Sequence, residues 1–215
     1  MFTPKKITVT VAILLFCSFT LFAQFTLGAN VFALSTENIK GVFGGGEVSY
    51  APTKMGIRPT GTLALAIAPS AKYKNADGDW VATKAGKTFR SYRTYMLIAR
   101  FGVEYYTQFA NGFSGGGTLY LSARDTFTNT DGDDHSQNRD WGRQSFLTYG
   151  IGAEVNCVCP FSTTVALTLK AFATYDIAGV SWKAHSVKGE QSSYGTDSIG
   201  GGYDAGISVG FRTLR

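Results

Sequence analysis

Apolar and polar residues alternate along most of the chain with a period of two. The last segment shows the pattern most clearly, because apolar side chains at Tyr203, Ala205, Ile207, Val209 and Phe211 are separated by polar or small ones. This period is typical of β-strands that have one apolar and one polar face. It predicts strands over 41–50, 61–71, 92–106, 117–127, 146–155, 163–177 and 203–211.

These segments are long for a soluble protein. They run from nine to fifteen residues, whereas an ordinary strand has about 5–6. A tilted strand that crosses the hydrocarbon layer of a membrane needs about 9–11 residues. The strand length therefore favours a β-barrel that spans a membrane.

The connections between the predicted strands are of two kinds. Those at 72–88, 128–142 and 178–197 are long and polar, whereas those at 107–114 and 156–162 are short. Long and short connections alternate along the chain, as in outer-membrane barrels with long external loops and short periplasmic turns. We therefore expect the three long connections to lie outside the cell.

The alternation defines seven strands, whereas bacterial single-chain barrels have an even number. An eighth strand could be hidden in 72–88 or begin within 34–40, or 51–60 could be a loop of a different kind. The predicted fold is all-β, a closed antiparallel up-and-down transmembrane β-barrel of eight strands.

The N-terminus has the features of a secretory signal peptide. Lys5 and Lys6 precede an uncharged stretch over 7–23, and Val31-Phe32-Ala33 resembles a cleavage site. We expect cleavage after residue 33, which leaves 34–215 as the barrel. An uncleaved anchor helix is the alternative, since the uncharged stretch could just span a membrane.

Composition agrees with a membrane barrel. Charged residues make up 16% of the chain, aromatic residues 14%, and there are 26 glycines. A disordered chain would carry more charge and fewer aromatic residues, and a mean hydropathy of +0.01 is low for a helical membrane protein. The net charge of +5 falls to +3 without Lys5 and Lys6, so we expect no nucleic-acid partner for this exported chain.

The alternation also fits a soluble barrel with an apolar interior. Two features favour lipid on the outside: the polar face consists mainly of small residues, and the apolar face has aromatic residues near strand ends. We expect an aromatic girdle formed by Tyr95, Tyr105, Tyr175, Tyr203 and Phe211.

If the polar face lines the lumen, each strand brings charges into it. We place Arg100, Arg124, Lys170 and Asp204 at mid-barrel, and Glu47, Glu104, Glu154 and Arg212 near the short turns. Enclosed charges are costly unless they are paired. We therefore expect the two layers to interlock into a plug of ion pairs; a gated path for ions or solutes is the alternative.

Candidate chemistry is sparse. His135-Ser136 and His185-Ser186 lie in predicted loops, but a catalytic nucleophile needs an oriented base, so we expect no catalytic residues. The oxygen-rich segments 75–79 and 129–135 lack the spacing of an EF-hand. Cys157 and Cys159 have no further metal ligands nearby, and whether they form a disulfide stays open. We expect no metal site and no cofactor.

The chain resembles the small bacterial outer-membrane β-barrels of the OmpA, OmpX, OmpW and Opa type. The resemblance rests on the leader, the alternating loops and the last strand, which ends in Phe211; the added residues 212–215 depart from it. It implies a location in the outer membrane of a diderm bacterium, insertion by the barrel-assembly machinery, and contact with outer-membrane lipid. It also implies a structural or adhesin-type role, with loops able to bind an extracellular or host ligand. The alternatives are a narrow porin-like channel for small or hydrophobic solutes and a lipid A-modifying enzyme.

Overall fold

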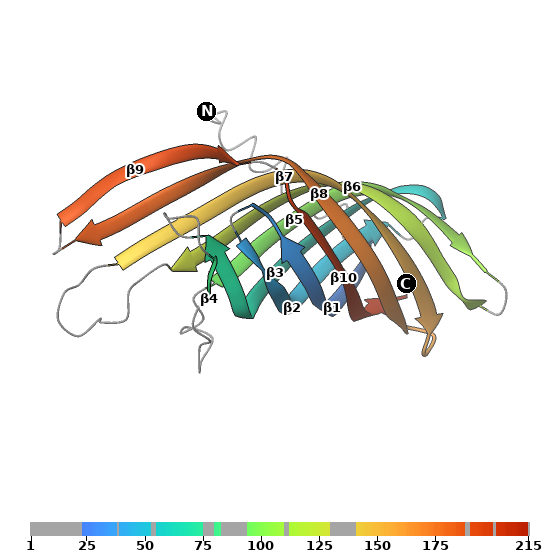
Figure 1. Ribbon diagram of the computed structural model, residues 1–215. Helices are drawn as coiled ribbons and strands as arrows, with labels where there is room; N and C mark the ends of the chain where they lie inside the picture. The colour runs from blue at the N-terminus through green and yellow to red at the C-terminus, as the bar shows by residue number, and fades with distance from the viewer. Residues whose placement is uncertain are drawn as a thin grey trace, which may run out of the picture.

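The computed structural model describes residues 23–37, 39–52, 55–74, 80–82, 94–109, 112–129, 141–187, 190–199 and 201–214, which form an all-β fold (Figure 1). No helix in this part of the chain is long and apolar enough to cross a membrane. The strands are β1 (Ala23–Ser35), β2 (Ile39–Pro52), β3 (Gly56–Lys74), β4 (Trp80–Ala82), β5 (Thr94–Gln108), β6 (Ser114–Asn129), β7 (Trp141–Pro160), β8 (Val165–Val187), β9 (Glu190–Ile199) and β10 (Tyr203–Thr213).

Eight of these strands close into a barrel. Their order is β10-β1-β2-β3-β5-β6-β7-β8, and β8 pairs in turn with β10. Every pairing in the ring is antiparallel. The predicted closed eight-stranded up-and-down barrel is therefore confirmed, and closure leaves the ring without a free strand edge.

The eighth strand is β1, which begins earlier in the sequence than predicted. Residues 26–35 pair with β10, and 23–35 pair with β2. The prediction that the barrel begins at residue 34 is therefore wrong. Outward-facing Phe25, Leu27 and Val31 are exposed, and they continue the apolar run of the expected leader, so hydropathy does not separate leader from strand. Residues 1–22 lie outside the described part of the chain.

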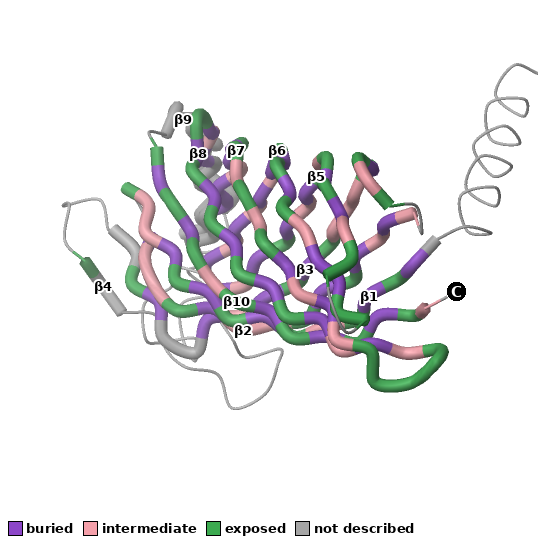
Figure 2. The backbone as a smooth tube through the Cα atoms, turned by 90° about the vertical axis from the view of Figure 1, so that its right-hand side faces the viewer, coloured by how far each residue is buried: buried purple, intermediate pink, exposed green. Residues whose placement is uncertain are grey.

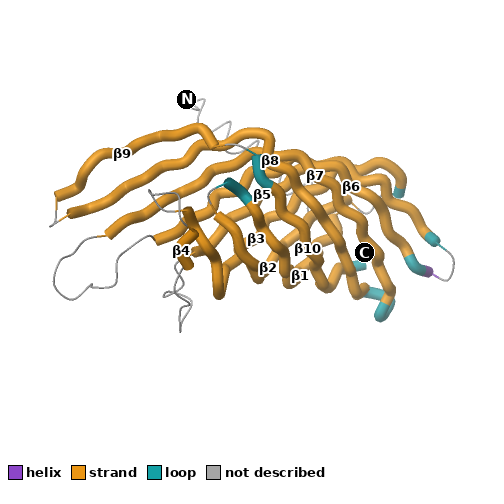
Figure 3. The backbone as a smooth tube through the Cα atoms, in the orientation of Figure 1, coloured by secondary structure: helices purple, strands orange, loops and turns teal. Residues whose placement is uncertain are grey.

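The pairing of β1 shows at which end of the barrel each connection lies. The β1–β2 connection lies at the same end of the barrel as the long connections, since Ser35 pairs with both Lys40 and Tyr203. The opposite end, called here the short-turn end, has the turns at 53–55, 109–113 and 161–164 (Figure 3). We call the first end the long-loop end.

Several predicted connections contain strand, and one of them is the short connection 156–162, since β7 continues to Pro160. Within 72–88, β3 continues to Lys74 and β4 pairs with it. Within 178–197, β8 continues to Val187, and β9 pairs with it beyond the barrel (Figure 1). Strand β8 exchanges partners along its length, pairing with β10 over 165–175 and with β9 over 179–187. The polar sequence here lacks the two-residue period, because this hairpin lies beyond the barrel wall.

Exposure alternates along each barrel strand, as Figure 2 shows. The apolar face is exposed and the polar face is buried, so the polarity is the reverse of that in a soluble protein. Ile207, for example, is 60% exposed, whereas Ser208 is 3% exposed. The lumen also holds an apolar cluster, formed by Phe32, Leu34, Ile39, Phe43, Ala64, Ala66, Ala68, Ala71, Met96, Ile98 and Phe172.

Candidate functional site: the charged lumen and the outer belt

The structure places all eight charged residues of the expected lumen network inside the barrel, and adds Arg58 and Asp176. The described lumen therefore contains five cations and five carboxylates. The cations are Arg58, Arg100, Arg124, Lys170 and Arg212, and the carboxylates are Glu47, Glu104, Glu154, Asp176 and Asp204. Equal numbers of both signs suit a closed interior, because an unpaired charge there would be costly.

Lys170 on β8 is at the centre of the first group. Its Nζ donates to Glu47 Oε1 at 2.9 Å and to Ser49 Oγ at 2.6 Å, and lies 3.9 Å from Glu154 Oε1. Glu47 also accepts hydrogen bonds from Ser208 and Asn30. These contacts join β1, β2, β7, β8 and β10 across the lumen, and almost fill the hydrogen-bonding capacity of the Glu47 carboxylate.

Arg58 and Glu104 form a second pair nearer the short-turn end. Arg58 Nε donates to Glu104 Oε2 at 2.7 Å, and its Nη1 donates to the carbonyl of Pro52. The Arg58 guanidinium lies 3.6 Å from the centre of the Tyr106 ring. Asn156 donates to the other oxygen of Glu104, so this buried carboxylate is held on both sides.

Arg212, in the extension after Phe211, also lies inside the barrel and is 4% exposed. Its Nε donates to Thr26 Oγ1 at 3.1 Å, and its guanidinium lies 5.6 Å from the centre of the Tyr106 ring. The extension therefore contributes to the interior next to the Arg58 pair.

Arg124 on β6 organises the charges nearer the long-loop end. It donates from one nitrogen to Asp176 and from another to Asp204. Asp204 also accepts from Thr174 at 2.9 Å and lies 3.7 Å from Arg100 Nη2. Two cations and two anions thus form a compact neutral cluster.

The contacts differ in detail from the predicted layers. Lys170, expected at mid-barrel, pairs with carboxylates of the lower layer and so links the two layers. Arg58 was missed because 51–60 read as a possible loop, although its alternation with Ile57 and Pro59 is a strand signal. Asp176 lies on the polar face of the predicted strand 163–177, so the same alternation could have found it.

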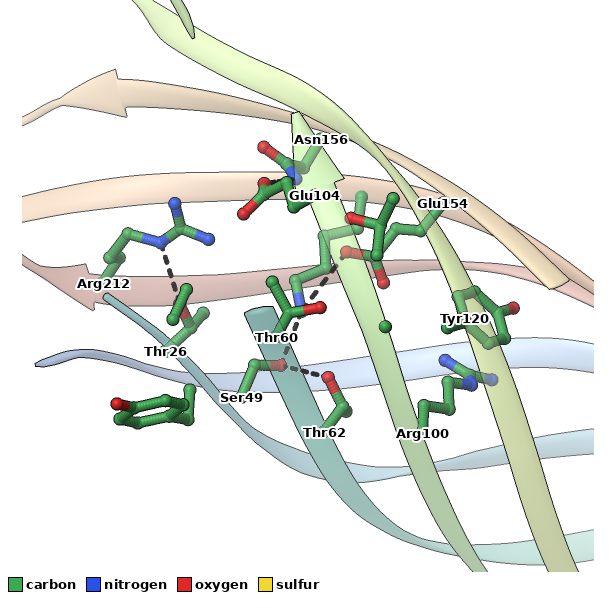
Figure 4. Close-up of a pocket in the computed structure, with 15 residues that line it drawn as sticks. Thr26, Ser49, Thr60, Thr62, Arg100, Glu104, Tyr120, Glu154, Asn156 and Arg212 are labelled. Carbon is green, nitrogen blue, oxygen red and sulfur yellow. Dashed lines mark hydrogen bonds and ion pairs between the residues drawn. The ribbon is translucent and has the colours of Figure 1, made fainter. Parts of the chain in front are cut away.

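Tyr120 and Arg100 line the same lumenal cavity as Glu104, Glu154 and Asn156 (Figure 4). The Tyr120 hydroxyl lies 3.0 Å from the Ala173 carbonyl oxygen and 2.9 Å from Thr174 Oγ1, and can donate to either. The Arg100 guanidinium lies 3.9 Å from the centre of the Phe172 ring. A cavity beside these groups has a volume of about 20 Å³, which suits about one water molecule. The charged side chains and these rings therefore occupy much of the lumen around this cavity.

Aromatic residues lie at both edges of the outer apolar face. All five residues of the expected girdle point outward: Tyr95 stacks on Phe127, and Tyr105, Tyr175, Tyr203 and Phe211 are 58–62% exposed. Tyr175 and Tyr203 are paired at the long-loop end. At the short-turn end, Phe25 packs edge-on against Tyr50 with ring centres 5.7 Å apart.

The spacing of these rings sets the height of the apolar belt between them. Tyr95 and Tyr105 are ten positions apart on β5, which is about 34 Å along a strand. A strand tilt of about 40° reduces this to a height of about 26 Å, close to the ~25 Å apolar band of outer-membrane barrels. At the edge of the belt toward the long-loop end, the Asp125 carboxylate accepts a hydrogen bond from the Ser145 hydroxyl at 2.6 Å.

The structure adds little to the candidate chemistry. Cys157 and Cys159 are free thiols with their sulfur atoms 3.9 Å apart, and no group of three metal-ligating side chains occurs among the described residues. His135 and the segments 75–79 and 130–135 lie outside the described residues. His185 and Ser186 lie on β8, but their side chains are outside the description.

Comparisons with known proteins agree with the geometry at the level of the fold. The structure is similar to neisserial surface protein A (TM-score 0.56, 11% identity), covering 90% of this chain and 97% of that one. It is also similar to a major outer membrane protein from Thermus thermophilus (TM-score 0.56, 12% identity), covering 88% and 99% of the two chains. No protein-family model matches the sequence, and no curated protein matches it.

Proposed function

We propose that the chain is an integral outer-membrane β-barrel with a structural or adhesin-type surface role and no catalysis. The observation that carries this proposal is the reversed polarity of the barrel. Large apolar side chains such as Leu119, 74% exposed, cover the outside, whereas arginine side chains such as Arg58, 1% exposed, lie inside. Such a surface needs acyl chains rather than water around it. The structural neighbours, one named a surface protein and one an outer membrane protein, support the same location.

The lumen supports a closed barrel rather than a porin-like channel. Nine of its ten described charges lie in ion pairs, and a cavity among them has about the size of one water molecule. A lipid A-modifying role has no described site to support it. Unchanged lipid A mass spectra after expression would agree with a non-catalytic role, and a new lipid A species would contradict it.

The leader and the orientation complete the proposal. A signal peptide is removed before β1 rather than after residue 33, because the barrel needs β1 to close. The barrel-assembly machinery inserts the chain, and the long-loop end faces outward, as in barrels with short periplasmic turns. The loops there are available to an extracellular or host ligand.

Electrophoretic mobility and surface proteolysis test this proposal together. We expect the purified chain to require detergent, and to migrate differently before and after heating, because a closed barrel resists unfolding in the detergent of the gel. On intact cells, protease should cut within 83–93 or 130–140, but not at 109–113. A chain that stays folded and monomeric without detergent would overturn the membrane location, and cleavage at 109–113 would overturn the orientation.

A further inference from the structure

The described outer face of the barrel includes two lysines that lie next to each other. Among the side chains that the structure describes, Lys40 and Lys72 are the two cations on this face, and the other five cations lie in the lumen. A cation on the outer face of a membrane barrel is costly within the apolar layer and is tolerated near its edge. The position of these two lysines is therefore informative.

Lys40 on β2 and Lys72 on β3 are direct partners in the antiparallel ladder. Like charges that face each other across a strand pair repel. Neither lysine forms an ion pair with a carboxylate among the described side chains, including Glu37 in the neighbouring turn. An anion bound between the two ammonium groups would convert this repulsion into attraction.

The short strand β4 adds a tryptophan to the same place. Its three residues pair with β3, with Ala82 opposite Lys72 and Trp80 opposite Lys74. Lys40 Nζ lies 3.9 Å from the centre of the Trp80 ring, a cation–π contact that holds the ammonium group in position. Tryptophan is enriched at the headgroup level of membranes.

The height of the lysines fits that level. Val42, 54% exposed, is an outward apolar residue of β2, and Lys40 occupies the next outward position toward the long-loop end. The lysines therefore follow directly above the apolar belt. A phosphate in the lipid headgroups would meet them there, and an ammonium group binds phosphate as a compact point charge.

We propose that Lys40, Lys72 and Trp80 form a binding site for the phosphate group of an anionic lipid in the leaflet at the long-loop end. This inference rests on the proposed membrane location. The site selects lipid by headgroup charge at one side of the barrel, over β2, β3 and β4.

Native mass spectrometry of the folded full chain tests the site. The barrel is released from micelles containing equal amounts of phosphatidic acid and phosphatidylcholine, and the retained lipid is counted. We expect the wild type to retain phosphatidic acid preferentially, and the preference to fall about fivefold for each lysine replaced in K40Q, K72Q and K40Q/K72Q. The variant K40R/K72R should keep it. Asp125→Asn, which changes an outer-face charge away from the site, is the matched control and should leave it unchanged.

Different results would overturn the site, the lipid assignment or the proposed function. Equal retention by the wild type and K40Q/K72Q, or an equal loss in Asp125→Asn, would overturn the site. Displacement of the lipid by millimolar inorganic phosphate would show a site for free phosphate and overturn the lipid assignment. A wild-type chain that forms no heat-modifiable barrel would overturn the proposed function, and this inference with it; a folded barrel without lipid preference overturns this inference alone.

Discussion

Lys170 makes three contacts with polar groups from β2 and β7, and it is the residue whose loss should disturb the lumen most directly. Replacing it with methionine leaves the Glu47 carboxylate buried without its cation, a change that typically costs about 3–5 kcal/mol. We expect the Lys170→Met variant to lose stability of this size in urea titrations of the barrel folded in vesicles, followed by far-UV circular dichroism.

Two further variants make this prediction specific to the ion pair. The double variant E47Q/K170M should be more stable than Lys170→Met alone. It replaces the Glu47 carboxylate, which would otherwise be buried without its cation. Lys72→Met on the outer face, measured in vesicles of uncharged phosphatidylcholine alone, should change the free energy of unfolding by less than about 0.5 kcal/mol. A double variant that is less stable than either single variant would contradict the pairing.

Gly152 provides a second test at the residue scale, because the Tyr120 ring lies against it. A Cβ atom at this position would come within 2.4 Å of two ring carbons of Tyr120 and 2.5 Å of the Ala173 carbonyl oxygen. We expect Gly152→Ala to destabilise the barrel by about 1–3 kcal/mol through overpacking. The absence of this glycine's side chain lets Tyr120 reach over β7 to β8.

Gly46 is the matched control for this substitution, since it also lies in a barrel strand. A Cβ atom there would have its nearest contact at 3.8 Å, with the Gly28 carbonyl. Gly46→Ala should therefore be neutral, or stabilising by about 0.4–1 kcal/mol. Equal destabilisation by both alanines in the urea titration would show that strand flexibility matters here rather than the ring contact.

At the scale of elements, β1 decides whether the barrel closes. Removing residues 23–33 would leave the facing edges of β2 and β10 unpaired, and unpaired backbone groups are not tolerated in hydrocarbon. We expect this deletion to give no heat-modifiable species in refolding trials, whereas deletion of residues 2–22 should refold normally. Mass spectrometry of the protein from the membrane should find an N-terminus no later than Ala23. An N-terminus at Leu34 with a folded barrel would contradict the role of β1.

The behaviour of β1 also shows what alternation can and cannot predict. Seven barrel strands follow from the two-residue period, because lipid on one side and the lumen on the other impose it at every turn of the chain. Strand β1 obeys the same period, but its apolar positions adjoin the uncharged stretch over 7–23, so the sequence reads as one leader. The hairpin of β8 and β9 was missed for the opposite reason: beyond the barrel no lipid imposes a period.

The candidate site was predictable in type but not in pairing. Alternation places Arg100, Glu104 and Asp204 on the inner face from sequence alone. It does not determine which strands face each other across the lumen at the same height, because this depends on strand shear. The link from Lys170 to Glu47, between β8 and β2, therefore appears only when the ring of strands is closed.

At the scale of the whole molecule, the paired charges determine whether the barrel conducts. Ten charged side chains of balanced sign lie in the described lumen together with the rings of Tyr120 and Phe172, and a cavity among them has a volume of about 20 Å³. Moving an ion through this space would mean breaking buried ion pairs, each of which costs several kcal/mol to separate. In the proposed membrane location, the apolar outer face contacts lipid, and the buried ion pairs oppose the passage of ions through the lumen.

Planar-bilayer recording tests this closure. We expect the full chain, inserted in a heat-modifiable form, to show no discrete conductance steps, since ion pairs between facing strands lie across its lumen. The double variant R100A/Y120A removes one cation of the cluster around Arg124 and the neighbouring Tyr120 ring, so it should give small steps if it folds. Heat-modifiability of the variant checks its folding, and Lys72→Met serves as a silent control. Regular steps from the wild-type chain would show that the charge clusters open, and would favour the channel over the closed surface barrel.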